Sequence, residues 1–251
     1  MLRLSAPNAY YLRTAQAQTG SVRRQLQAAL VTLRAGAELV RTTPVLLLLF
    51  TAQLFVGAFL EGFFRIQRAH LLTNVSRPRL VLPGIGALDV IVWFGVLDGL
   101  NSLLTLIGAE IVRRSVDLTR PVMVARLLVG CYTLVLVGGL CFALAGAFAV
   151  AAGALLIVQL FQQLAQPVTA AWLNQHIASD VRATVLSLSS QVSAAGQLGG
   201  GLGVGVVSNR YGMRAGLMLA TLFVTPLLAL YAGSAVSSQR AVASRVSISE
   251  P

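Results

Sequence analysis

The chain has 251 residues, of which 56% are hydrophobic and only 11% are charged, and its mean hydropathy is +0.78. A soluble domain of this length carries roughly 25% charged residues, so we expect a lipid bilayer, rather than water, to be its solvent. The net charge of +11 comes from arginines in short clusters between apolar stretches. That arrangement is typical of membrane loops and argues against nucleic-acid binding.

Six apolar stretches are long enough to span a membrane, because a spanning helix needs about 20 such residues. They cover residues 44–64, 85–111, 122–142, 147–173, 184–207 and 215–232. Pro44 and Pro121 stand at the start of two stretches, where the missing N–H costs nothing. Pro167 and Pro226 lie inside two others and are expected to kink them. The sequence predicts an all-α, polytopic membrane protein with a six-helix transmembrane bundle at 44–233.

The flanking segments are more polar. Residues 1–43 carry apolar side chains that step by four and three along one helical face: Leu26, Leu30, Leu33, Ala37 and Val40. This spacing predicts an amphipathic helix on the cytoplasmic membrane surface, with a solvated helical linker as the alternative. Residues 234–251 are predicted to form a flexible cytoplasmic tail. In this topology thirteen of the nineteen arginines lie on the side of both termini, which favours cytoplasmic termini.

The polar content of the six stretches repeats in threes. The third and sixth carry few polar groups besides hydroxyls, so we expect them to be peripheral, while the other four line an interior space. Gly108 stands five residues before Arg113, and Gly205 stands five residues before Arg210. Each unit would cross the membrane three times. Because three is an odd number, the second unit starts on the opposite side and is inverted relative to the first. Inverted repeats with a binding site at their interface are a hallmark of secondary transporters.

Amides in the fourth stretch share one helical face, since they stand at i, i+3, i+4 and i+7: Gln159, Gln162, Gln163 and Gln166. Amides are costly to expose to lipid, so the stripe is expected to face inward. It would then line a polar, uncharged substrate path, together with Gln191 and Gln197 of the fifth stretch. The alternative is that the amides form hydrogen bonds between helices.

Acidic residues of the first two stretches suggest two further roles. Asp98 and Asn101 share a face of the second stretch, and Asp98 is the deepest carboxylate in the sequence. We interpret it either as a proton carrier or as a packed, paired structural acid. Glu61 and Arg65 stand four apart at the end of the first stretch, which indicates a local salt bridge in preference to a gate.

Glycines in the fifth stretch form three GxxxG pairs, which allow two helix backbones to approach closely: 196/200, 199/203 and 201/205. A phosphate loop is the competing interpretation, and it fails because no Gly-Lys-Ser/Thr follows the glycines.

No cofactor, metal or covalent chemistry is expected from the sequence. His70 and His176 are isolated and are predicted to lie outside the spans, and Cys131 and Cys141 share one apolar stretch as packing residues. Serine, zinc and aspartate motifs of intramembrane proteases are missing from the sequence. We therefore do not expect an enzyme.

Several motifs in the C-terminal hundred residues resemble the second half of a major facilitator superfamily transporter. They are Trp172-Leu-Asn174, Asp180-Val-Arg182-Ala-Thr184, the glycine run, and Asn209-Arg210-Tyr-Gly212-Met-Arg214. The last is similar to the loop signature of the family, which usually has aspartate where Asn209 stands, and Arg113 with Arg114 resembles its degenerate copy. Glu61-Gly-Phe-Phe-Arg65 is similar to the seventh helix of bacterial drug-efflux members, which tend to have an acid where Phe64 stands.

The resemblance implies that the six stretches correspond to helices seven to twelve of the family, and residues 1–43 to the link between halves. It implies a secondary active transporter in the bacterial inner membrane that exports small drug-like molecules. Membrane lipid and a small-molecule substrate are then the expected partners, with a homodimer or a missing N-terminal half completing the site. The alternative is a truncated or non-transporting half-bundle that binds and regulates a full transporter.

Overall fold

The computed structural model describes residues 38, 40–75, 81–82, 86–87, 90–117, 120–177 and 181–236. Its helices are α2 (Pro44–Thr73), α3 (Val90–Ser115), α4 (Pro121–Leu144), α5 (Phe148–Gln175), α6 (Arg182–Tyr211) and α7 (Met213–Leu222). Residues 225–236 continue α7 after a short turn. Between α2 and α3 the strands β1 (Val81–Leu82) and β2 (Gly86–Ala87) pair antiparallel. Nearly all of the predicted surface helix at 1–43 and most of the predicted tail at 234–251 lie outside the described residues.

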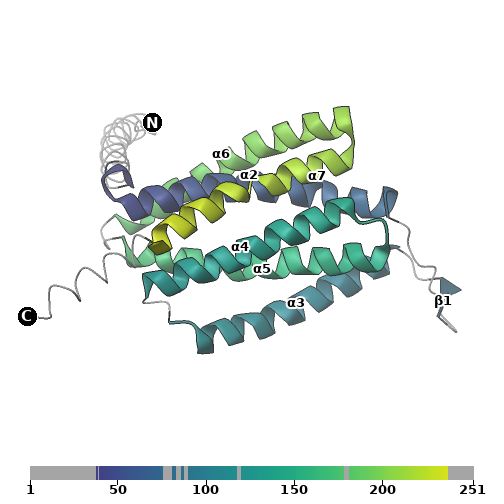
Figure 1. The fold of residues 1–251 in the computed structure, drawn as a ribbon, viewed down its shortest axis with the longest axis horizontal. Coiled ribbons are helices and arrows are strands. Elements are labelled where there is room, and N and C mark those ends of the chain that lie inside the picture. The colour runs from purple at the N-terminus through teal and green to yellow at the C-terminus, as the bar shows by residue number, and fades with distance from the viewer. Residues whose placement is uncertain are drawn as a thin grey trace, which may run out of the picture.

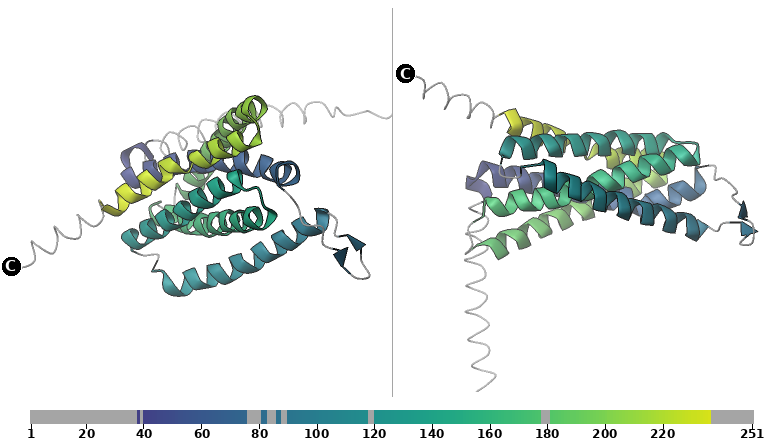
Figure 2. Two further views of the ribbon diagram at one scale, coloured as in Figure 1. Left: turned by 45° about the vertical axis from the view of Figure 1, so that its right-hand side comes forward. Right: turned by 90° about the horizontal axis from the view of Figure 1, so that it is seen from below.

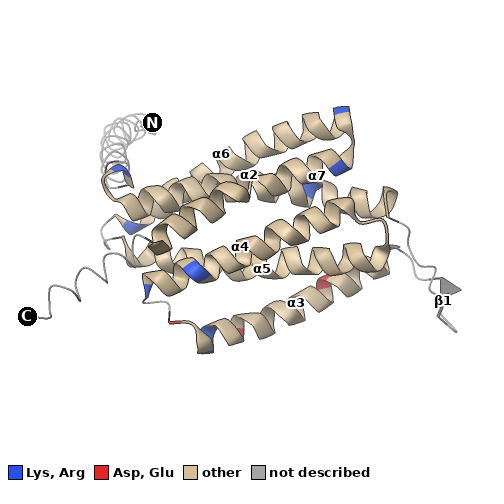
Figure 3. Cartoon of the chain, viewed as in Figure 1, with Lys and Arg blue, Asp and Glu red and all other residues tan. Residues whose placement is uncertain are grey.

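Five of these helices are long and apolar enough to cross a membrane: Pro44–Thr73, Val92–Ser115, Pro121–Leu144, Phe148–Gln175 and Met213–Val236. This confirms the coarser prediction of a helical protein with apolar, membrane-length helices. Helix α6 is not among the five, because glycines, serines and amides occupy much of its length. Figure 3 shows long uncharged stretches along the helices, with arginines gathered toward their ends.

Prolines determine where several helices begin and break. Helices α2 and α4 begin at Pro44 and Pro121, and the residue before each proline is extended, as the proline ring requires. The break after α7 lies just before Pro226, which has no N–H and crowds the carbonyl four residues earlier. The kink predicted there is confirmed, whereas α5 continues without a break through Pro167.

The helices run alternately along one axis, so that α2 begins at the same end of the bundle at which residues 225–236 finish (Figure 1). Helix α2 packs mainly on α6, α4 packs mainly on α5, and α7 contacts both α2 and α4. The core between these groups contains aromatic rings in contact, such as Phe63 of α2 and Phe142 of α4, whose centroids lie 5.5 Å apart with the ring planes tilted by 50°.

Helix α3 lies at the edge of the bundle, where it packs on α5 (Figure 2). Trp93 meets the ring of Phe148 at 4.9 Å, and α3 is the least buried of the five apolar helices. The prediction that the third stretch is peripheral is therefore wrong, and the second stretch lies at the edge of the bundle although it lines a cavity as predicted. Helix α4 is drawn inward because Gly138 and Gly139 let it approach Val158 of α5 and Thr221 of α7 closely.

The α2–α6 contact depends on glycine. A methyl group added at Gly196 would overlap the backbone carbonyl of Leu54, and one added at Gly200 would overlap the backbone of Ala58. The GxxxG prediction is confirmed for this pair. Gly199 and Gly203 face open space, so the pair 199/203 makes no comparable contact.

Candidate functional site

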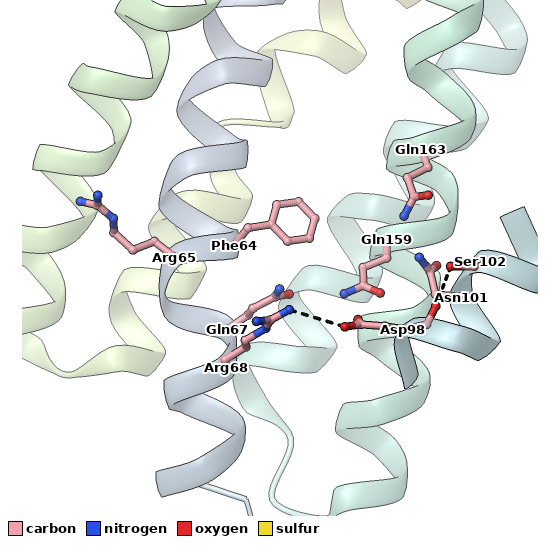
Figure 4. Close-up of a pocket in the computed structure, with 9 residues that line it drawn as sticks. All are labelled: Phe64, Arg65, Gln67, Arg68, Asp98, Asn101, Ser102, Gln159 and Gln163. Carbon is pink, nitrogen blue, oxygen red and sulfur yellow. Dashed lines mark hydrogen bonds and ion pairs between the residues drawn. The ribbon is translucent and has the colours of Figure 1, made fainter. Parts of the chain in front are cut away.

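A cavity of about 630 Å³ opens between α2, α3 and α5 (Figure 4). Its volume is in the range typical of small-molecule sites. It is lined by Phe64, Arg65, Gln67, Arg68, Asp98, Asn101, Ser102, Gln159 and Gln163. Five of these residues were predicted from the sequence as site or path residues: Arg65, Asp98, Asn101, Gln159 and Gln163. The structure thus brings together predicted residues from three separate stretches of the sequence.

An ion pair joins α2 to α3 at the cavity. Arg68 Nη2 lies 3.5 Å from Asp98 Oδ2, and the two side chains are 64% and 55% exposed. The guanidinium of Arg68 also lies 5.6 Å from the centre of the Phe94 ring. The expectation of a deeply buried Asp98 is wrong, since the carboxylate is open to the cavity and paired. Periodicity placed Asp98 correctly beside Asn101 but could not show how far α3 stands from its neighbours.

Each of the three helices that form the cavity contributes one buried amide side chain: Gln67 of α2, Asn101 of α3 and Gln159 of α5. Each is at most 9% exposed, and the carbonyl oxygen of each accepts no hydrogen bond from the described residues. Leaving such an oxygen without a donor costs about 1–3 kcal/mol. These oxygens are themselves covered by protein, so they gain a donor only when their side chains turn toward the cavity.

Sequence reasoning missed Gln67 and Arg68 because the first helix was predicted to end at residue 64. It continues to Thr73, so that Arg68 lies on a helix and not in the connection expected to follow the first stretch. Phe63, Gln67 and Leu71 are all buried, and their spacing of four residues was the available signal. The polar side chains between them hid this periodicity.

The four glutamines that share one face of α5 lie in different surroundings. Gln159 and Gln163 line the first cavity. Gln166 lines a second cavity of about 290 Å³ with Gln53 and Ser193 of α2 and α6. Gln162 is 1% exposed, lines neither of these cavities, and neither atom of its amide has a described partner. A shared helical face therefore did not give a single shared path.

A third cavity of about 380 Å³ lies between α2 and α6 and includes Glu61, Arg65 and Gln197. The predicted salt bridge is confirmed, with Arg65 Nε at 2.9 Å from Glu61 Oε1. Gly201 leaves room for the acid, since an added methyl group there would stand 2.8 Å from Glu61 Cγ. Gln191 is exposed and lines none of the three cavities.

The two predicted loop motifs lie at opposite ends of the bundle (Figure 1). At the end of α3, Arg113 donates two hydrogen bonds to Glu110, of 2.8 and 2.7 Å, and Arg114 donates a third. Gly108 packs against Leu164 of α5, whereas Gly205 faces open space.

Between α6 and α7, Gly212 is the single connecting residue and has a φ of 90°, which glycine adopts without strain. The neighbouring Asn209, Arg210 and Arg214 are exposed. Arg210 lies 5.6 Å from the centre of the Tyr211 ring, and the motif has no part in the cavities described above.

Histidines and cysteines form no metal centre among the described residues, which contain no cluster of three or more His, Cys, Asp or Glu suited to an ion. His70 is fully buried in α2 and its ring meets Phe142 at 5.3 Å, so the prediction that it lies outside the first span is corrected. His176 follows the end of α5 and contacts the carbonyl oxygen of Trp172 at 2.9 Å.

No protein-family model, curated protein or solved structure matches this chain. The functional argument therefore depends on the geometry of the cavities and the packing of the helices.

Proposed function

We propose that this chain is a six-helix half of a secondary active transporter of the major facilitator type, which exports small molecules across the bacterial inner membrane. The observation that carries the proposal is the polar cavity of about 630 Å³ among helices of membrane-spanning length. Buried amides and an ion pair within such helices are expensive unless they face water or a solute. A transport path supplies that surrounding, and it needs no covalent chemistry.

Most helix contacts support two inverted three-helix units, although the contact of α6 with α7 has no comparable counterpart between α3 and α4. If α2, α3 and α4 correspond to α5, α6 and α7, the contact of α2 with α6 corresponds to that of α5 with α3. In the same way the contact of α2 with α7 corresponds to that of α5 with α4. The contacts α2–α5 and α4–α7 each join a helix to its own counterpart, so exchanging the two units leaves them unchanged. A pseudo-two-fold axis between α2 and α5 would produce these relations, as in secondary transporters built from inverted repeats.

Helix α6 is the sixth span in this proposal, although its composition is less apolar than that of the others. Its extensive packing on α2, a helix of clear membrane character, supports a position at the same depth. Its glycines serve that packing, and Gln197 faces a cavity and not lipid. With six spans the N-terminus and the C-terminus of the chain lie on the same side of the membrane. We assign that side to the cytoplasm from the arginine distribution.

A second six-helix unit completes the path in this proposal. Each of the three cavities has residues of α2 in its lining, and Arg65 lines two of them. Alternating access requires two bundles that rock about a site between them. We therefore place a second copy of the chain, or an N-terminal half, against the surface of α2 that carries the cavities.

Reconstitution tests the proposal. The chain is inserted into liposomes at a density that permits dimers, and efflux of ethidium is followed under an imposed pH gradient. Flux is expected for the wild type and for Gln191→Leu, which alters an amide outside the cavities, and a strong loss is expected for Gln163→Leu. Folded, dimeric protein that moves neither ethidium nor a zwitterion such as L-phenylalanine would contradict the transporter and favour a regulatory half-bundle.

A further inference from the structure

The first cavity offers groups of both charges to a solute. Arg68 and Asp98 face each other across it with a single contact of 3.5 Å. Arg65 also lines the cavity, but its guanidinium is already engaged by Glu61 at 2.9 Å. Exposed ion pairs of this kind are weak because both partners remain solvated, so the Arg68–Asp98 pair is easily opened.

The acceptors of the cavity also lack donors. Figure 4 shows Gln67, Asn101 and Gln159 gathered around the Arg68–Asp98 pair. All three amides are buried and have a carbonyl oxygen without a donor among the described residues. The oxygens are covered in this arrangement, so the groups open to an occupant are the charged side chains of Arg68 and Asp98.

We infer that this cavity binds a small zwitterion whose ammonium and carboxylate groups are as close as those of an α-amino acid. The carboxylate accepts hydrogen bonds from the guanidinium of Arg68, and the ammonium donates to the carboxylate of Asp98. The bound zwitterion thereby replaces one weak internal ion pair with two. Phe64 gives the cavity an apolar wall for the remainder of the solute.

Solutes with a single charge fit the same lining less well. A cation is attracted by Asp98 but repelled by Arg65 and Arg68, and an anion is attracted by Arg68 but repelled by Asp98. The inference rests on the proposed function in one respect: it narrows the class of transported solute from drug-like molecules to amino-acid-like zwitterions.

Binding to the full chain in lipid nanodiscs tests the inference without any need for transport. The probes are L-phenylalanine, its methyl ester, which lacks the carboxylate, and N-acetyl-L-phenylalanine, which lacks the ammonium. We expect the zwitterion to bind at least about tenfold more tightly than either derivative, which is about 1.4 kcal/mol. This test needs only the wild type. Equal binding of the three probes, or tightest binding of the methyl ester, would overturn the inference.

Charge variants test which residue recognises the carboxylate of the solute and which recognises its ammonium group. Arg68→Gln is expected to abolish discrimination against the methyl ester, and Asp98→Asn to abolish discrimination against the N-acetyl derivative. Arg126→Gln and Asp117→Asn remove the same charges outside the cavity and are expected to leave both preferences unchanged. Arg68→Lys keeps the charge and should retain the preference, and a folded Arg68→Gln variant with an unaltered preference would overturn the assignment.

The outcomes for this inference and for the proposed function are separate. Selective binding of phenylalanine without flux of either phenylalanine or ethidium in liposomes would support the zwitterion site and contradict the transporter. Flux of ethidium without any preference among the three probes would support the transporter and overturn the zwitterion site.

Discussion

The α2–α6 contact gives a quantitative prediction, because two glycines of α6 stand against backbone and not against movable side chains. Replacing Gly196 with alanine places the new methyl group over the Leu54 carbonyl and 2.9 Å from its carbon atom. Replacing Gly200 places it 2.7 Å from the side chain of Ala58 and over the backbone of that residue. No rotamer change relieves either overlap, so the two helices must move apart.

The magnitude follows from two opposing effects. Alanine is favoured over glycine in a helix interior by about 1 kcal/mol, whereas overpacking a well-packed contact costs about 1–3 kcal/mol. Because the overlapped atoms belong to the backbone, we take the upper value of about 3 kcal/mol. Gly196→Ala and Gly200→Ala are therefore each expected to lower the free energy of unfolding by about 2 kcal/mol.

Matched variants on the same helix provide the control. Gly199 and Gly203 face open space, so alanine at either position is expected to be neutral or to stabilise by up to about 1 kcal/mol. Unfolding of all four variants is measured in lipid bicelles by steric trapping. If Gly196→Ala and Gly203→Ala differ by less than about 1 kcal/mol, the close approach of α2 and α6 is incorrect.

Three further predictions concern single features. Gly212→Ala forces a side chain into the left-handed region and is expected to cost about 1–3 kcal/mol, whereas Gly233→Ala, in an exposed helical position with open space around it, should not destabilise; thermal unfolding in detergent compares them. A double-mutant cycle of Glu61→Ala and Arg65→Ala should give a coupling of about 0.3–0.5 kcal/mol, and a coupling several times larger would place the pair in a dry environment. Gln162→Leu removes an amide whose two polar atoms are buried without described partners, so chemical unfolding should show a gain of about 1 kcal/mol or more; a loss would show that the amide has a partner.

Local features of the fold were predictable because single residues determine them. Pro44 and Pro121 begin helices, and Pro226 breaks one, since a proline ring limits both its own backbone and that of the residue before it. The contact of Gly196 and Gly200 was likewise available from their spacing. In these cases the physical cause lies within a few residues of the sequence.

The site was only partly predictable, because it depends on which helices meet. Spacing grouped Gln159 with Gln162 on one face, yet the first lines a cavity and the second does not. Composition suggested that α3 is interior, whereas it lies at the edge of the bundle. Hydropathy also could not separate Arg68, a helical residue facing a cavity, from a residue in an external loop. Tertiary packing decides each of these questions.

The central claim is that water fills the cavity between α2, α3 and α5, and cysteine labelling tests it most directly. Both native cysteines, Cys131 and Cys141, are free and are first replaced with alanine. A single cysteine is then introduced at Gln163, which lines the cavity, or at Val137, which is 52% exposed on the apolar surface of α4. A membrane-impermeant methanethiosulfonate reagent is added to either side of proteoliposomes, since it reacts with the thiolate that forms only in water.

We predict rapid modification at position 163 from at least one side and none at position 137. If position 163 reacts no faster than position 137 from both sides, the cavity is closed to water and the account of its function is contradicted.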